Sequence, residues 1–143
     1  EGAARLVEHC DDMPAAYARN DFTVIPYTTP GGGKECPQSA LESLACGVPV
    51  LVSAVCPFAR FVEENRCGVT FDPTPEALAW AMEEGLRSWE ELYRAARKAA
   101  EAHFDPGKIT AFYERLYRET AESAGGQNPR TQATQGHGTS LKA

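Results

Sequence analysis

Short apolar runs alternate with helix-like segments over the first half of the chain. The runs 22–25, 48–52 and 68–71 are rich in β-branched or aromatic residues and are bounded by proline, glycine or polar residues, which predicts buried strands. A weaker apolar centre at residues 5–9 suits the end of another strand. Because the intervening segments are long enough to cross over as helices, the pattern predicts an α/β fold with a parallel sheet.

Capping residues predict where the helices begin and end. Asp12 and Pro14 suit the start of a short helix, and Pro37 suits the first helical position of a second helix. Gly47 supplies the left-handed residue that ends this second helix. A further short helix is expected over residues 56–65.

After residue 73 the pattern is helical. Thr74 and Pro75 open a helix on which Leu78, Met82 and Leu86 share one face. Two more helices are expected, over residues 89–103 with Ser88 as the cap, and from residue 105 to residue 117.

The last twenty residues differ from the rest in composition. From Ala124 onward Gly, Gln, Asn, Thr and Ser dominate, and so few apolar residues cannot offset the entropy of ordering. The expected organisation is one incomplete α/β domain over residues 1–123 and a disordered polar tail over residues 124–143. His137 stands alone in this tail, without the fixed partners that a metal site needs.

Length and charge limit the functions available to the chain. Its 143 residues suit one domain, too few for two Rossmann-like domains, so we expect a missing partner or a longer protein. The first 123 residues hold 20 acids against 12 bases, a net charge of −8, which disfavours nucleic acid as a partner. No apolar run approaches the roughly 20 residues of a transmembrane helix, although peripheral membrane association stays open.

Five cysteines without a Cys-x-x-Cys pair favour a reduced, cytoplasmic setting. Each is expected to be a small buried apolar residue rather than a metal ligand or half of a disulfide. They are Cys10, Cys36, Cys46, Cys56 and Cys67.

The candidate chemistry lies in residues 31–50, where a triple-glycine loop leads into a helix. In open α/β sheets the loop after a parallel strand forms the ligand crevice. The backbone amides of Gln38, Ser39 and Ala40 are expected at the helix start, where they and the helix dipole favour a phosphate group.

Glu42 lies about one turn into this helix and has no salt-bridge partner four residues away, where Gln38 and Cys46 stand. Its two carboxylate oxygens match two vicinal ribose hydroxyls. From the residues alone, an ordinary solvated glutamate is the favoured interpretation.

The stretch resembles the signature of the group-one glycosyl transferases, retaining enzymes of the GT-B fold. The resemblance covers roughly residues 5–117 and is closest over Glu-Ser-Leu-Ala-Cys-Gly-Val-Pro-Val at residues 42–50. Other matching positions are Tyr17, Asp21, Val24 and Pro26 upstream and Val62, Gly68 and residues 75–78 downstream.

The resemblance implies the C-terminal, donor-binding half of such an enzyme: an incomplete Rossmann-like parallel sheet flanked by helices and followed by C-terminal helices. The implied reaction transfers a sugar from a nucleoside-diphosphate sugar to an acceptor hydroxyl with retention, without a metal or a cofactor. By this likeness Glu42 binds the ribose, the amides near Pro37 to Ala40 hold the diphosphate, and the loop from Lys34 to Cys36 faces the transferred sugar.

The chain also departs from the family pattern. The family's first acidic position falls on Lys34, and Glu35, the candidate catalytic residue, is displaced by one position. A shifted loop would let Glu35 replace that acid, or Lys34 would reach a phosphate. Cys56, Pro57 and Arg60 stand where the family usually has a glycine pair and a glutamate.

The family's donor domain ordinarily begins with a strand and a loop whose Arg and Lys clamp the diphosphate, and nothing in the sequence corresponds to them, so we expect the isolated chain to be nearly inactive. The expected partner is a missing N-terminal acceptor domain. Three other functions remain open. They are a GT-B-related sugar-nucleotide epimerase, a non-catalytic nucleotide-binding or interaction module, and an unrelated flavodoxin-like binding domain. The base, the sugar and the acceptor are not determined by the sequence.

Overall fold

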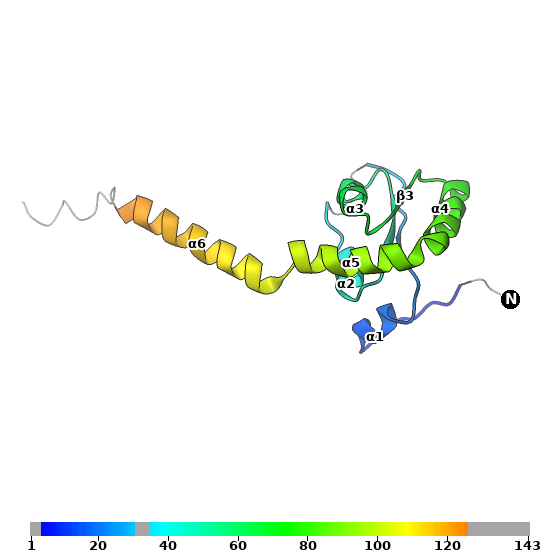
Figure 1. Cartoon of the computed structure of the whole chain (residues 1–143), viewed down its shortest axis with the longest axis horizontal. Coiled ribbons are helices and arrows are strands. Elements are labelled where there is room, and N and C mark those ends of the chain that lie inside the picture. The colour runs from blue at the N-terminus through cyan, green and yellow to red at the C-terminus, as the bar shows by residue number, and fades with distance from the viewer. Residues whose placement is uncertain (1–3, 31–34, 126–143) are drawn as a thin grey trace, which may run out of the picture. The chain divides into compact units, whose positions relative to one another are not determined.

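A computed structural model describes residues 4–30 and 35–125, and its centre is a parallel sheet of three strands in the order β1-β2-β3 (Figure 1). Thr23 and Gly68 both pair with Val50, so β2 is the central strand. The expected α/β fold with a parallel sheet is confirmed. The elements are α1 (Met13–Tyr17), β1 (Thr23–Ile25), α2 (Gln38–Ala45), β2 (Val50–Ser53), α3 (Ala59–Asn65), β3 (Gly68–Phe71), α4 (Pro75–Arg87), α5 (Trp89–His103) and α6 (Pro106–Gly125).

The core lies on both faces of the sheet, and β2 is buried along its whole length. Val50 and Val52 pack with α2, α3 and α5, through residues such as Leu44, whereas Leu51 points the other way and packs with Ala81 of α4. Side chains alternate between the faces of a strand, so a strand covered on both faces must be apolar throughout. This explains the unbroken apolar run in the sequence.

The predicted caps are largely those of the structure. The Asp12 side chain accepts from the Ala15 amide, and the Thr74 hydroxyl accepts from the Ala77 amide. Gly47 has a φ of 81°, the left-handed conformation expected of it. Pro37 is the N-cap of α2 rather than its first helical residue, a shift of one position.

Residues 5–9 were expected to contain the end of a strand, and that prediction is wrong. Leu6 and Val7 are 87% and 59% exposed, and no strand lies between residue 4 and α1. An extended segment becomes a strand only by hydrogen bonding to a neighbour, and among the described residues β1 to β3 pair only with one another.

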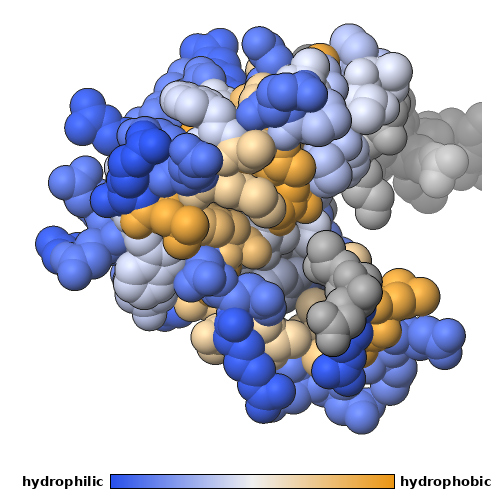
Figure 2. All heavy atoms as spheres, turned by 90° about the vertical axis from the view of Figure 1, so that its right-hand side faces the viewer, coloured by the Kyte–Doolittle hydropathy of each residue, from blue (hydrophilic) through white to orange (hydrophobic). Residues whose placement is uncertain are grey.

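The predicted apolar face of α4 is only partly the buried one, because Leu78 packs against the cluster around Leu51 whereas the other two residues of that face do not. Met82 is 42% and Leu86 59% exposed, whereas Ala81 and Gly85 face the sheet. A Cβ on Gly85 would lie 2.9 Å from the Phe22 ring, so the helix approaches the sheet too closely for large side chains there. On the face of the molecule drawn in Figure 2, hydrophobic residues lie at the surface among hydrophilic ones.

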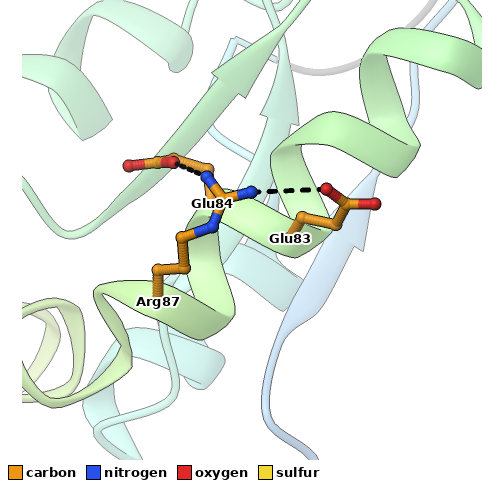
Figure 3. A network of polar contacts seen from close by, with 3 residues as sticks. All are labelled: Glu83, Glu84 and Arg87. Atoms are coloured by element: carbon orange, nitrogen blue, oxygen red, sulfur yellow. Dashed lines mark hydrogen bonds and ion pairs between the residues drawn. The ribbon is translucent and has the colours of Figure 1, made fainter.

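Charged side chains cover the solvent side of α4. Arg87 pairs with Glu84 at 2.8 Å and with Glu83 at 3.4 Å (Figure 3). The three side chains are exposed by 39–71%, so the pairs are screened by water and contribute little to stability. This network is a solvated helix surface and not a candidate site.

α6 belongs to a second compact unit that begins at Pro106. It runs to Gly125, eight residues beyond the predicted end at residue 117, and so includes the first two residues of the predicted tail. The remainder of that tail, with His137, lies outside the described residues. No described helix is long and apolar enough to cross a membrane.

Only part of the expectation for the cysteines is confirmed. Cys56 and Cys67 are buried, Cys46 is half-buried, and Cys10 and Cys36 are exposed; all five are free thiols. Burial raises the pKa of the Cys67 thiol to about 12, so this cysteine is inert core material.

Candidate functional site

The candidate site follows the carboxyl end of β1, where the chain enters α2. Pro37 is buried at the N-cap, and Gln38 and Ser39 are exposed on the first turn. Lys34 lies outside the described residues. Glu35 and Cys36 are described and exposed, immediately before the helix. The structure therefore places the predicted residues 35–40 around one helix start.

Of the three amides expected at this helix start, one is engaged by the protein. The Ala40 amide donates to the Pro37 carbonyl at 3.0 Å. For Gln38 and Ser39 the structure records no backbone hydrogen-bond partner among the described residues. The anion-binding capacity of this start therefore rests on two amides rather than three.

Glu42 is half-buried, and both of its carboxylate oxygens accept hydrogen bonds. The Tyr17 hydroxyl donates to Oε2 at 3.0 Å, and the Gln38 amide nitrogen Nε2 donates to Oε1 at 2.8 Å. A simply solvated glutamate would be neither half-buried nor bound by a residue of another helix. Because a carboxylate has about four acceptor positions, Glu42 can still accept from a ligand.

Tyr17 is the residue whose role the sequence did not reveal. It is the last residue of α1 and is buried beside α2. Burial, followed by the hydrogen bond to Glu42 and the negative charge of that carboxylate, raises the pKa of Tyr17 to about 12. The hydroxyl therefore keeps its proton at neutral pH and donates to Glu42. Its place in the family pattern was the only signal in the sequence.

A pocket of about 320 Å³ opens beside Glu42, between α1 and α2. This volume lies at the lower end of the range for small-molecule sites, and such sites combine apolar walls with a few polar groups. Glu42 is the acidic group of the wall, and the other lining residues are mostly apolar. The lining residues are Met13, Pro14, Tyr17, Glu42, Ala45 and Cys46.

α2 is anchored so that Glu42 has a defined position. Ser43 is fully buried, and its Oγ lies 2.8 Å from both the Thr23 hydroxyl and the Val48 carbonyl oxygen. At the C-terminal end of the same helix, Arg97 donates to the Ala45 carbonyl at 2.5 Å. Rigid support of this kind gives a site its precision.

The loop side of the site carries a second thiol. Although Cys36 is exposed as a residue, partial burial of its thiol, with a smaller contribution from the Cys56 thiol, raises the pKa of Cys36. Cys36 is thus a poor nucleophile at neutral pH. Within the described part of the chain no three His, Cys, Asp or Glu side chains are grouped as a metal site would require.

Comparison with known proteins agrees with this geometry. The family model of the glycosyl transferases group 1 matches residues 4–103, which include α1, the sheet and α2. Among solved structures, the chain is similar to sucrose-phosphate synthase from Thermosynechococcus elongatus, with a TM-score of 0.65 and 27% sequence identity. That match covers 76% of this chain but only 27% of the enzyme. Curated protein sequences give no match.

The parallel sheet, the helix after β1 and the structural match define an α/β domain of the GT-B glycosyltransferase type. With 100 of its 143 residues matched by the family model, the chain belongs to the group 1 glycosyl transferases. The suspected relationship to the C-terminal GT-B domain is confirmed, whereas α6 lies beyond the matched residues.

Proposed function

We propose that this chain binds the nucleotide-sugar donor of a retaining glycosyltransferase and that an N-terminal acceptor domain completes the enzyme. The reaction transfers the sugar of a nucleoside-diphosphate sugar to an acceptor hydroxyl. The observation that carries the proposal is Glu42, a half-buried carboxylate with unused acceptor positions in the wall of a pocket.

The spacing along α2 suits a nucleotide. Residues 38 and 42 are four apart, which is about 6 Å along a helix axis. A phosphate at the amides of Gln38 and Ser39 would therefore leave the ribose hydroxyls near Glu42. The apolar wall from Met13 and Pro14 would receive the base.

Charge stabilisation in this proposal comes from the protein. The helix start stabilises the departing diphosphate, Lys34 adds a positive charge, and no metal or cofactor takes part beyond the donor. Glu35 is the candidate contact to the transferred sugar, with Cys36 and Pro37 beside it. Because the family's Arg and Lys clamp for the diphosphate has no counterpart in this sequence, the isolated chain is expected to bind the donor without rapid turnover. A cytoplasmic location fits its free thiols.

Calorimetry with UDP, GDP and ADP tests the proposal on the chain itself. At least one nucleotide is expected to bind, and Glu42→Gln is expected to weaken it about tenfold, the effect of losing charged hydrogen bonds. Glu76→Gln on the exposed first turn of α4 is the matched control and should change nothing.

Two outcomes identify the alternatives. Failure of all three nucleotides to bind points to an interaction module instead. Inversion of a sugar nucleotide in the absence of any acceptor points to an epimerase. If the wild type and Glu42→Gln bind the nucleotide with equal affinity, Glu42 is not part of the nucleotide-binding site.

A further inference from the structure

The two protein donors to Glu42 differ in how easily they can leave. Tyr17 is 9% exposed and reaches Oε2 from another helix, so its hydroxyl is held by the packing of α1. Gln38 is an exposed side chain on the same helix as Glu42 and reaches Oε1 at 2.8 Å. Pairs four residues apart on a helix surface contribute little to stability.

The environment of the tyrosine strengthens this asymmetry. A hydrogen bond to a charged acceptor is stronger than a neutral one, more so away from water. If the Tyr17 hydroxyl turned from Glu42, a half-buried carboxylate would lose its only donor from outside its own helix among the described residues. Water can replace the Gln38 amide at little cost, because that side chain is already at the surface.

We infer that Tyr17 is a positioning residue that fixes the Glu42 carboxylate for ribose, and that Gln38 is a placeholder which the ribose displaces from Oε1. The inference rests on the proposed nucleotide binding and adds how the site selects a ribose. Tyr17 itself need not touch the ligand. It holds Oε2 so that Oε1, once Gln38 has left, presents two acceptor positions to the ribose hydroxyls.

The ratio of affinities for ribose and 2′-deoxyribose nucleotides measures the positioning role of Tyr17 separately from its contribution to stability. The affinities of UDP, GDP and ADP are compared with those of their 2′-deoxy forms, dUDP, dGDP and dADP, for whichever base binds. The wild type is expected to prefer the ribose form about tenfold, because the deoxy sugar makes one hydrogen bond fewer to the charged Glu42 carboxylate. In Tyr17→Phe this ratio should fall toward one.

Two further variants show whether Tyr17 positions the Glu42 carboxylate or only supports the fold. Gln38→Ala should keep the wild-type ratio, and Tyr113→Phe, which removes a hydroxyl from exposed α6, should change neither affinity. An equal loss of affinity for both sugars in Tyr17→Phe, with the ratio intact, means that Tyr17 only supports the fold and overturns the inference. A ratio that collapses in Gln38→Ala overturns the placeholder role. If no nucleotide binds the wild type, the proposed function fails and the inference fails with it.

Discussion

Gly68 faces the carbonyl oxygen of Val50 so closely that a Cβ on Gly68 would lie 1.9 Å from that oxygen. Both residues belong to paired strands, β3 and the central β2, so the oxygen cannot turn away without breaking the sheet. The position requires glycine because of this close approach, and Gly68 has no positive φ.

Gly68→Ala is expected to lower the free energy of unfolding by at least about 3 kcal/mol, since the overlap is with backbone. Urea denaturation followed by circular dichroism measures the loss. Gly85→Ala is the control, because its new Cβ would meet the Phe22 ring at 2.9 Å, where a side chain can shift, and alanine favours the helix. Equal losses in the two variants would contradict the structure.

Gly47 tests the cost of a left-handed conformation. With φ at 81°, Gly47→Ala is expected to cost about 1–2 kcal/mol of stability. Its Cβ would also lie 3.2 Å from the Tyr93 ring. Gly47→Asn adds the same Cβ but tolerates this conformation better, so thermal denaturation should rank Asn above Ala. The reverse order would show that the ring contact dominates.

Alanine substitutions of two leucines compare the buried core with the exposed face of α4. Leu44 is fully buried between α2 and the sheet, so Leu44→Ala is expected to cost about 2–5 kcal/mol. Leu86→Ala removes a side chain that is 59% exposed and should change stability by no more than about 0.5 kcal/mol. Denaturant midpoints compare the two directly. A larger loss of stability in Leu86→Ala than in Leu44→Ala would mean that the apolar face predicted from the sequence is the buried one.

Ionisation of Tyr17 makes the stability of the folded chain depend on pH in the alkaline range. Its pKa is raised from 10.0 to about 12 in the folded chain, so the folded state holds the proton more tightly than the unfolded state. This contribution to stability is complete below pH 10 and is lost as the pH rises towards 12. Subtracting the tyrosinate absorbance of Tyr17→Phe from that of the wild type isolates the step. A step centred near 10 would mean that the hydroxyl is neither buried nor bonded to Glu42.

Much of the fold could be predicted from the sequence, because apolar runs and helix caps depend on residues that are close together in the chain. A strand buried on both faces must be apolar throughout, as β2 is, and a cap such as Thr74 needs only the amide three residues away. One boundary shows the limit. The predicted strand began at residue 48, but the Val48 amide bonds back to the Ser43 carbonyl and ends α2 instead. The strand therefore starts at Val50.

Only part of the candidate site could be predicted from the sequence. Glu42 and the helix start could be predicted from the sequence, because their spacing lies within one helix. The Tyr17 contact joins residues 25 positions apart, and no local pattern specifies which donor a carboxylate will meet. The engagement of the Ala40 amide by Pro37 likewise depends on how the loop enters α2.

The sequence by itself determined the parallel order of alternating strands and helices, the left-handed residue at Gly47 and the position of Glu42 on its helix. These follow from side-chain periodicity and capping, which act within a few residues. Only the tertiary structure decided that residues 5–9 form no strand, that Ala81 and not Leu86 faces the sheet, and that Tyr17 holds Glu42. Burial and hydrogen bonding of these groups depend on neighbours from distant parts of the chain.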